Sequence, residues 1–208
     1  SGTAGVVPMG TTGESATLNT REHLEVISRT IELANGRISV VAGTGSNSTE
    51  ETLHQTKEAE SLGADACLLV TPYYNRPTQE GLYAHFKKVA QTTSVPLVLY
   101  NVPGRTGCDL LPETIGRLSS IEGIVGIKEA SGKIERVSEI KSVSASDFFI
   151  LSGEDALTLE MMNNGAVGTI SVTANVLPKA MAEFCDSFLS GNVKRASAID
   201  EVLQSVHE

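Results

Sequence analysis

The segment Ile124-Val125-Gly126-Ile127-Lys128-Glu129-Ala130-Ser131-Gly132 decides how this chain folds, because an apolar run leads directly into a lysine and then into turn residues. A short uncharged run bounded by turn-forming residues is typical of a strand buried in a parallel sheet. Lys128 then lies where the strand leaves the core, and Glu129 points to the opposite side because side chains alternate along a strand. The segment therefore predicts a buried parallel strand with a lysine at its carboxyl end.

A lysine at the end of a buried strand has two interpretations. Where water is scarce, the ammonium form is disfavoured and the pKa of Lys128 falls. At a pKa of roughly 7–8 part of the population is a free amine, which attacks carbonyl carbons and forms a Schiff base. The alternative is a lysine that simply ends a strand and reaches solvent. This segment alone favours the solvent-exposed lysine, since lysine is rarely buried.

Similar apolar segments recur along the chain and alternate with helical patterns. A helical repeat over residues 24–34 ends at Asn35-Gly36, and Ser48 with Glu51 resembles a capping box at the start of the next helix. Strict alternation with a unit of roughly 30 residues implies a parallel sheet with right-handed crossovers. The seven predicted strands cover residues 5–9, 38–42, 66–70, 96–101, 124–128, 149–153 and 167–172.

Two α/β architectures fit this alternation, a doubly wound open sheet and a (β/α)8 TIM barrel. The barrel is favoured because polar, reactive residues follow the carboxyl ends of the predicted strands and no Gly-x-Gly-x-x-Gly follows the first strand. Seven strands are one fewer than a barrel needs, so we expect an incomplete barrel in which the first β-α unit and the C-terminal helices are missing. We predict a barrel portion over residues 1–172 and the start of a C-terminal helical region over residues 173–208.

The composition argues against several classes of function. The chain has 208 residues with 16 basic and 25 acidic side chains, and its net charge of −9 disfavours nucleic acid and anionic membrane surfaces as partners. No apolar run approaches the roughly 20 residues of a membrane span, and no signal peptide is recognisable. Cys67, Cys108 and Cys185 fit the unpaired thiols of a reducing cytoplasm, and the four histidines offer no metal-ligand spacing. We therefore expect a cytoplasmic protein without a metal.

Three features near predicted strand ends are candidates for chemistry. The turn Gly10-Thr11-Thr12-Gly13-Glu14 offers two hydroxyls and backbone N–H groups to a carboxylate or phosphate, although a purely structural turn fits equally well. Tyr100 ends the strand before that of Lys128, where its phenol can transfer protons beside the amine. The alternative for Tyr100 is a core or interface tyrosine. Arg105 follows in a Pro/Gly-rich loop, and its fork suits a carboxylate, although a surface arginine is the commoner case.

Three motifs in fixed order resemble one superfamily over essentially the whole chain. They are Gly10-Thr11-Thr12-Gly13-Glu14, Tyr100-Asn101-Val102-Pro103-Gly104-Arg105-Thr106-Gly107 and Gly126-Ile127-Lys128-Glu129-Ala130. The chain resembles the Schiff-base aldolases, the superfamily of dihydrodipicolinate synthase and N-acetylneuraminate lyase, and its Pro-Gly-Arg-Thr-Gly sequence is similar to the first of these two branches.

The resemblance implies a lyase that needs no cofactor beyond a covalent pyruvate Schiff base on Lys128. The enamine would attack L-aspartate 4-semialdehyde, and the product would cyclise to 4-hydroxy-tetrahydrodipicolinate, on the way to diaminopimelate and lysine. By the same resemblance Thr11 and Tyr100 belong to a proton relay, which Tyr74 completes from a neighbouring subunit of a homo-oligomer, a dimer of dimers.

The resemblance also assigns binding residues. Thr12 would hold the pyruvate carboxylate, Arg105 the semialdehyde carboxylate, and Ile170 would line the pyruvate pocket. Thr20 stands where many relatives carry a second histidine, so the strength of inhibition by L-lysine stays open. The implied lysine-binding set is Ser15, Ala16, His23, Asn47, Glu51 and Tyr73.

Two other functions remain as alternatives. A related pyruvate-dependent aldolase would act on a sugar acid, but a polyol needs hydroxyl partners rather than the second carboxylate clamp that Arg105 offers. A non-catalytic small-molecule-binding barrel would have no use for the amine of Lys128 beside the phenol of Tyr100. Both residues therefore favour the enzyme.

Overall fold

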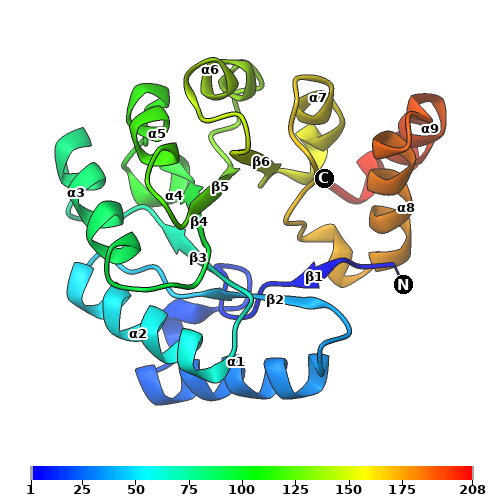
Figure 1. The fold of residues 1–208 in the computed structure, drawn as a ribbon. Helices are drawn as coiled ribbons and strands as arrows, with labels where there is room; N and C mark the ends of the chain where they lie inside the picture. The colour runs from blue at the N-terminus through cyan, green and yellow to red at the C-terminus, as the bar shows by residue number, and fades with distance from the viewer. Residues whose placement is uncertain (1, 208) are drawn as a thin grey trace.

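The computed structural model describes residues 2–207 and shows a curled parallel sheet with helices on its outer side (Figure 1). Each strand pairs in parallel with the strand before it, in the order β1-β2-β3-β4-β5-β6. This arrangement is that of a (β/α)8 barrel from which part of the ring is missing, as predicted. The six strands of the described residues are β1 (Gly5–Val6), β2 (Ser39–Gly43), β3 (Ala66–Val70), β4 (Leu97–Asn101), β5 (Ile124–Glu129) and β6 (Phe149–Ser152).

The helices follow the strands along the outside of the curve. The α-helices are α1 (Thr20–Ala34), α2 (Thr49–Leu62), α3 (Gln79–Ala90), α4 (Pro103–Thr106), α5 (Pro112–Ser119), α6 (Glu135–Val143), α7 (Thr158–Asn163), α8 (Pro178–Leu189) and α9 (Val193–His207). Short 3₁₀ helices are η1 (Ser15–Thr17), η2 (Asp155–Leu157) and η3 (Thr173–Asn175).

Side-chain caps fix where the helices begin. Asn19 forms a complete capping box with Glu22 at the start of α1. The capping box predicted at Ser48 is only half formed: Ser48 accepts a hydrogen bond from the Glu51 N–H at 3.3 Å. The Glu51 carboxylate instead accepts a hydrogen bond from the Ser46 hydroxyl at 2.6 Å, and the Ser48 N–H donates to the same hydroxyl at 3.2 Å.

Two apolar clusters lie on the two faces of the sheet. The larger lies between the sheet and its helices and includes Leu99, Ile127 and the fully buried Phe86. The smaller lies on the inner face and joins Leu68, Val98, Tyr100, Val102 and Ala130. Alternate residues of one strand thus enter different clusters, which explains why the strands are apolar on both faces.

The seventh predicted strand differs from expectation. Residues 167–172 form a single parallel bridge, Thr169 to Ser152, rather than a regular strand. The backbone still pairs with β6, since Val167 donates to Ile150 and Ile170 donates to Ser152, each at 2.9 Å. Gly168 has φ 153°, far from the value of about −120° in parallel strands, so the regular ladder is interrupted there.

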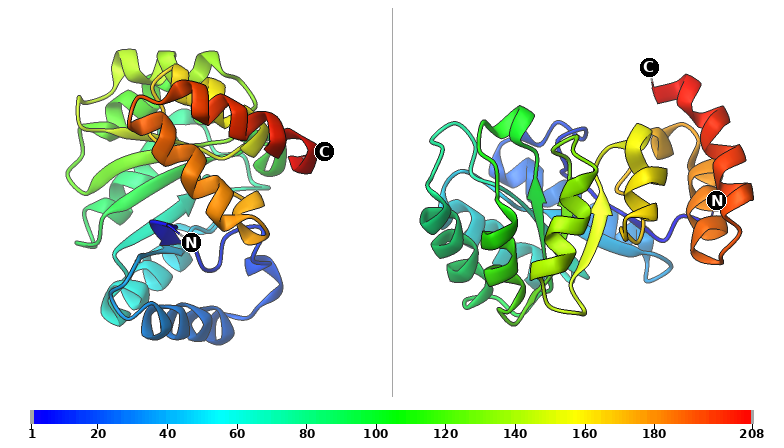
Figure 2. Two further views of the ribbon diagram at one scale, coloured as in Figure 1. Left: turned by 90° about the vertical axis from the view of Figure 1, so that its right-hand side faces the viewer. Right: turned by 90° about the horizontal axis from the view of Figure 1, so that it is seen from above.

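The end of the chain packs beside its beginning. Helices α8 and α9 contact each other, and α9 also contacts α7. Figure 2 shows α8 and α9 on the side of the molecule where the N-terminus lies. A Cβ on Gly2 would lie 3.3 Å from Cβ of Ala182 in α8. The domain boundary between residues 172 and 173 stays a prediction. Within residues 2–207 no helix is both long and apolar enough to cross a membrane.

Candidate active site

The threonine-rich turn is held against the carboxyl end of β2 by a close backbone approach. A Cβ on Gly43 would lie 2.2 Å from the carbonyl oxygen of Met9, so only glycine fits there. The turn closes on itself through hydrogen bonds from the N–H of Gly13 to Gly10 and from the N–H of Glu14 to Thr11, each at 3.0 Å. Thr11 and its neighbour Thr12 are exposed in this turn.

The phenol and the amine predicted to share a cavity come from neighbouring strands. Tyr100 of β4 and Lys128 of β5 are register partners, and Nζ of Lys128 lies 4.4 Å from the centre of the Tyr100 ring. Tyr100 belongs to the inner apolar cluster, against which Ile170 also packs. The structure therefore brings three of the predicted site residues together on the inner face of the curved sheet.

Burial makes Lys128 an unusual lysine. Its pKa falls to about 8, chiefly because burial disfavours the ammonium. The nearby negative charges of Asp155 and Glu154 act to raise the pKa of Lys128, whereas the positive charge of Arg105 lowers it further. A lysine with this pKa is partly a free amine near neutral pH and can form a Schiff base with a carbonyl compound.

A glycine of the next strand end makes room for the lysine stem. A Cβ on Gly153 would lie 2.8 Å from Cε of Lys128 and 2.7 Å from Cβ of Ala130. The N–H of Gly153 donates to the carbonyl of Glu129 at 2.8 Å, which fixes the backbone at this distance. Any larger residue at position 153 would displace the amine.

Tyr100 stays protonated at neutral pH. Burial raises the pKa of its phenol, while a hydrogen bond with Thr11 and the charge of Arg105 partly offset this rise. The phenol can therefore donate a proton beside Lys128, and the Thr11 hydroxyl is in place to exchange protons with it. The relay of Thr11 and Tyr100 stays a prediction.

Arg105 lies on the short helix α4, directly after β4, with an exposed side chain. Its positive charge acts to lower the pKa of both Tyr100 and Lys128. An exposed guanidinium at the rim of the inner face is available to a bound carboxylate.

Tyr74 differs from the other predicted relay residues. Its side chain is 90% exposed, and its φ of 71° is uncommon for a residue other than glycine. Its N–H donates to the carbonyl of Thr106 at 3.3 Å, which ties the segment after β3 to the Arg105 loop. Tyr73, next to it, is 39% exposed. The chain thus projects the Tyr74 phenol into solvent.

The predicted lysine-binding residues follow the carboxyl ends of the first three strands. Ser15 and Ala16 lie in η1 and Tyr73 follows β3. The buried imidazole of His23 donates through Nε2 to the carbonyl of Gly43 at 2.7 Å. The Asn47 carbonyl accepts from Asn75 at 3.3 Å, and Glu51 bonds to Ser46. These bonds fix His23 and Glu51 to the end of β2 and to the loop after it.

Sequence reasoning missed the acidic pair after β6. Glu154 and Asp155 act on the pKa of Lys128, and Asp155 accepts the N–H groups of Val172 and Thr173 at 2.8 and 2.9 Å. The signal was present, since both residues follow a predicted strand end. Among residues 2–207 no group of three or more His, Cys, Asp or Glu side chains is arranged to hold a metal ion.

Comparisons with known proteins place this site in a family. The chain matches the dihydrodipicolinate synthetase family over residues 1–208. It is 54% identical to the 4-hydroxy-tetrahydrodipicolinate synthase of Stutzerimonas stutzeri over 206 residues, which is 99% of this chain and 70% of that protein.

Solved structures agree. The pyruvate complex of the chloride-inhibited dihydrodipicolinate synthase from Acinetobacter baumannii has a TM-score of 0.96 at 48% identity, with 99% of this chain and 71% of that one covered. The lysine-bound enzyme from Cyanidioschyzon merolae has a TM-score of 0.94 at 38% identity, with 98% and 70% covered. With a curled parallel sheet, an amine of lowered pKa over a phenol, and these matches, the chain belongs to the dihydrodipicolinate synthetase family.

Proposed function

We propose that the protein acts as a 4-hydroxy-tetrahydrodipicolinate synthase, which condenses pyruvate with L-aspartate 4-semialdehyde. The observation that carries the proposal is the amine of Lys128, with a pKa of about 8, set 4.4 Å from the ring of a phenol that is itself hydrogen-bonded to Thr11. Relatives of this name are 52–54% identical over nearly the whole chain.

The reaction needs only groups that this chain and its substrates supply. The amine of Lys128 attacks the keto carbon of pyruvate, a C–N bond forms, and one water leaves to give the imine. Loss of a proton from the pyruvate methyl group gives an enamine, whose carbon attacks the aldehyde of the second substrate. The amino group of that substrate then displaces Lys128 from the imine carbon, which closes the ring and restores the amine. One water is released overall, and no cofactor takes part.

The neighbouring groups have defined roles in this sequence. The carbinolamine intermediate loses its oxygen as water, so a proton donor is required beside Lys128, and the Tyr100 phenol with Thr11 supplies it. Thr12 of the same turn binds the pyruvate carboxylate, against Ile170. Arg105 binds the carboxylate of the semialdehyde through its planar fork.

Product analysis tests the function. The protein is incubated with pyruvate and either L-aspartate 4-semialdehyde or N-acetylmannosamine, and the products are identified by mass spectrometry. We expect a cyclic dicarboxylate with the first aldehyde and no product with the amino sugar. Formation of a sugar acid instead would assign the chain to the other branch, and no product with either aldehyde would reject catalysis.

We also propose that the protein is cytoplasmic and that it binds L-lysine. The binding residues would be Ser15, Ala16, His23, Asn47, Glu51 and Tyr73. The relative from Cyanidioschyzon merolae, whose structure has lysine bound, supports binding of this ligand. Glu51 can pair with an ammonium group and His23 helps to shape the site, held by Gly43.

The exposed Tyr74 leads to a prediction about assembly. In a homo-oligomer, arranged as a dimer of dimers, the phenol completes the relay of Thr11 and Tyr100 in a neighbouring subunit. Tyr74→Phe keeps the ring and removes only the hydroxyl, so we expect turnover to fall at least tenfold, about 1.4 kcal/mol in the barrier, with the oligomer intact. Steady-state kinetics and analytical ultracentrifugation measure the two properties.

Mixing subunits tests whether the phenol is shared. Tyr74→Phe and Lys128→Ala subunits are each nearly inactive, but a mixed dimer contains one cavity with both groups and should regain part of the activity. Verified mixed oligomers that stay inactive would place the action of Tyr74 within its own subunit or outside catalysis.

A further inference from the structure

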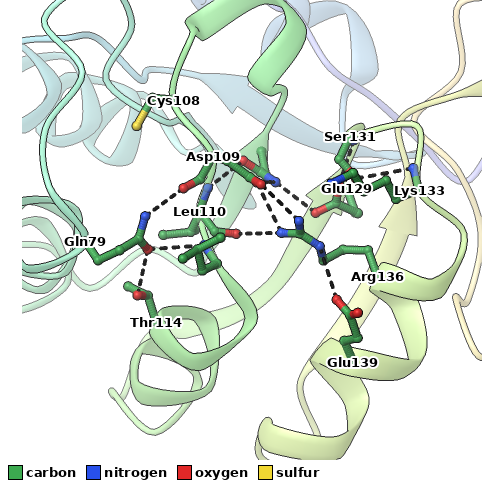
Figure 3. Close-up of polar contacts among 12 residues, drawn as sticks. Gln79, Cys108, Asp109, Leu110, Thr114, Glu129, Ser131, Lys133, Arg136 and Glu139 are labelled. Carbon is green, nitrogen blue, oxygen red and sulfur yellow. Dashed lines mark hydrogen bonds and ion pairs between the residues drawn. The ribbon is translucent and has the colours of Figure 1, made fainter.

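A polar cluster lies on the outer face of the sheet, and Figure 3 shows its members Asp109, Glu129 and Arg136. It consists of Asn101, Asp109, Glu129 and Arg136, which we call the outer cluster. Asn101 follows Tyr100 in β4, Glu129 follows Lys128 in β5, and Asn101 and Glu129 are register partners as Tyr100 and Lys128 are. Because side chains alternate along a strand, the inner pair faces the substrate side and the outer pair faces the helices.

Asn101 connects both strands to the end of the Arg105 loop. Its amide nitrogen donates to Glu129 at 3.1 Å and to Asp109 at 2.9 Å, and its amide oxygen accepts the N–H of Leu110 at 3.0 Å. The side chain of Asn101 is fully buried. The segment that carries Arg105 leaves β4 after Asn101, and its far end at Asp109 and Leu110 bonds to the Asn101 side chain, so one amide holds both of its ends.

Arg136 of α6 clamps the same point from the helix side. Its guanidinium donates to both carboxylate oxygens of Asp109, at 3.1 and 2.9 Å, and to the carbonyl of Leu110 at 3.2 Å. Its side chain is only 5% exposed and that of Asp109 30%. Burial alone would raise the pKa of Asp109, but the bonds from Arg136 and Asn101 outweigh it and the pKa is lowered, so Asp109 is ionised at neutral pH.

Glu129 extends the cluster to the turn after Lys128. Its second carboxylate oxygen accepts the N–H of Ser131 at 2.6 Å, and the residue is 1% exposed. Apolar contacts also attach α6 to the sheet, since Val137 and Ile140 of that helix are fully buried in the apolar core. The polar bonds instead converge on chain segments that adjoin Tyr100, Lys128 and Arg105.

We propose that the outer cluster is a positioning device for the reaction, in which the pair of Asp109 and Arg136 fixes the Arg105 loop for the second substrate. The proposal rests on the function assigned above. Arg105 is exposed and lies on α4, so the backbone of this segment sets the point from which its fork reaches out. The two ends of that backbone are fixed through Asn101, and Asp109 with Arg136 fixes the far end. Neither Asp109 nor Arg136 is required to touch a substrate.

Asp109→Asn tests the device with almost no change in shape. The substitution removes the negative charge of residue 109 and replaces one carboxylate oxygen with an NH2 group, which cannot accept a hydrogen bond from Arg136. Arg136 therefore loses one of its two bonds to this side chain, while residue 109 stays partly solvated. We expect KM for L-aspartate 4-semialdehyde to rise about five- to tenfold, with KM for pyruvate and the rate of borohydride trapping of pyruvate on Lys128 changed less than twofold. Glu139→Gln is the matched control, because Glu139 also pairs with Arg136, at 3.5 Å, but is half exposed. Among residues 2–207 no hydrogen bond or ion pair joins the Glu139 side chain to residues 102–110. It should leave both KM values unchanged.

The two KM values separate positioning from stability. Partial unfolding would lower kcat and leave both KM values in place, and thermal melting of each variant shows how much folded protein is present. Equal changes in the two KM values, or none, would overturn the proposal. If Asp109→Asn is too unstable to measure, Arg136→Lys replaces it, because lysine keeps the charge but lacks the planar fork. It should likewise raise KM for the semialdehyde and leave KM for pyruvate nearly unchanged. The proposed function is tested independently, since it fails only if the unaltered protein forms no cyclic dicarboxylate from pyruvate and L-aspartate 4-semialdehyde.

Discussion

Lys128→Met is expected to abolish turnover, with a loss on the order of 10⁴-fold or more, because no other group replaces a covalent nucleophile. Methionine keeps an unbranched apolar stem beside Gly153 and removes only the amine. The folded state should not suffer. Because the pKa of Lys128 falls from 10.5 to about 8 on folding, its burial costs stability that builds up as the pH falls from 10.5 to about 8 and is fully present below that. The variant removes this cost, so its melting temperature at pH 7 should be equal or higher. Steady-state kinetics and calorimetry measure the two effects.

Covalent trapping identifies the nucleophile directly. Reduction with borohydride in the presence of pyruvate should add one group, at Lys128, in the unaltered protein and none in the variant, as read by peptide mass spectrometry. The trapping rate should rise with pH and level off above about 8, the pKa of Lys128. At pH 7 roughly one-tenth of such lysines are free amines, against fewer than one in a thousand at the ordinary pKa. An adduct on a different lysine contradicts the mechanism.

Arg105→Ala should raise KM for the semialdehyde roughly ten- to a hundredfold and change KM for pyruvate far less. The reason is the loss of one charge-assisted contact, worth about 1.5–3 kcal/mol. The pKa of Lys128 should also rise, since Arg105 lowers it, so the pH at which trapping levels off moves upward. Kinetics with each substrate varied in turn measure the first effect, and the pH profile of trapping measures the second.

A second arginine serves as the control for a general effect of losing one positive charge. Arg117→Ala removes an exposed arginine of α5 that pairs with Glu80, whereas the charges that shift the pKa of Lys128 are those of Asp155, Glu154 and Arg105. It should leave both KM values as they are. If Arg105→Ala raised both KM values equally, Arg105 would be a structural residue.

Local sequence signals were sufficient for most of the fold. Helix starts follow from side chains such as Asn19 and Thr78, which cap their own helices within three residues. The strand over residues 167–172 was over-predicted because an apolar run does not reveal the φ of 153° at Gly168. The missed bond partner of Glu51 has a similar cause, since Ser46 competes only once the loop is folded.

The candidate site divides in the same way. The placement of Lys128, Tyr100 and Thr11 on one face was predictable, because each follows or ends a strand of one parallel sheet. The outer cluster was not, because its members come from separated segments and meet only through the register of β4 with β5 and the docking of α6. Alternation says that Asn101 and Glu129 share a face, but not that they bond to each other.

The sequential strand order has a consequence for how the protein is made. Every strand pairs with its predecessor, so a new unit of roughly 30 residues needs only the edge already in place. A ribosome that adds about 5–20 residues per second delivers one such unit in roughly 1.5–6 s. Loops of this size close in well under a millisecond. Each β-α unit therefore has ample time to dock before the next emerges. The exposed edge strand of the growing sheet is then paired by the next strand to be synthesised.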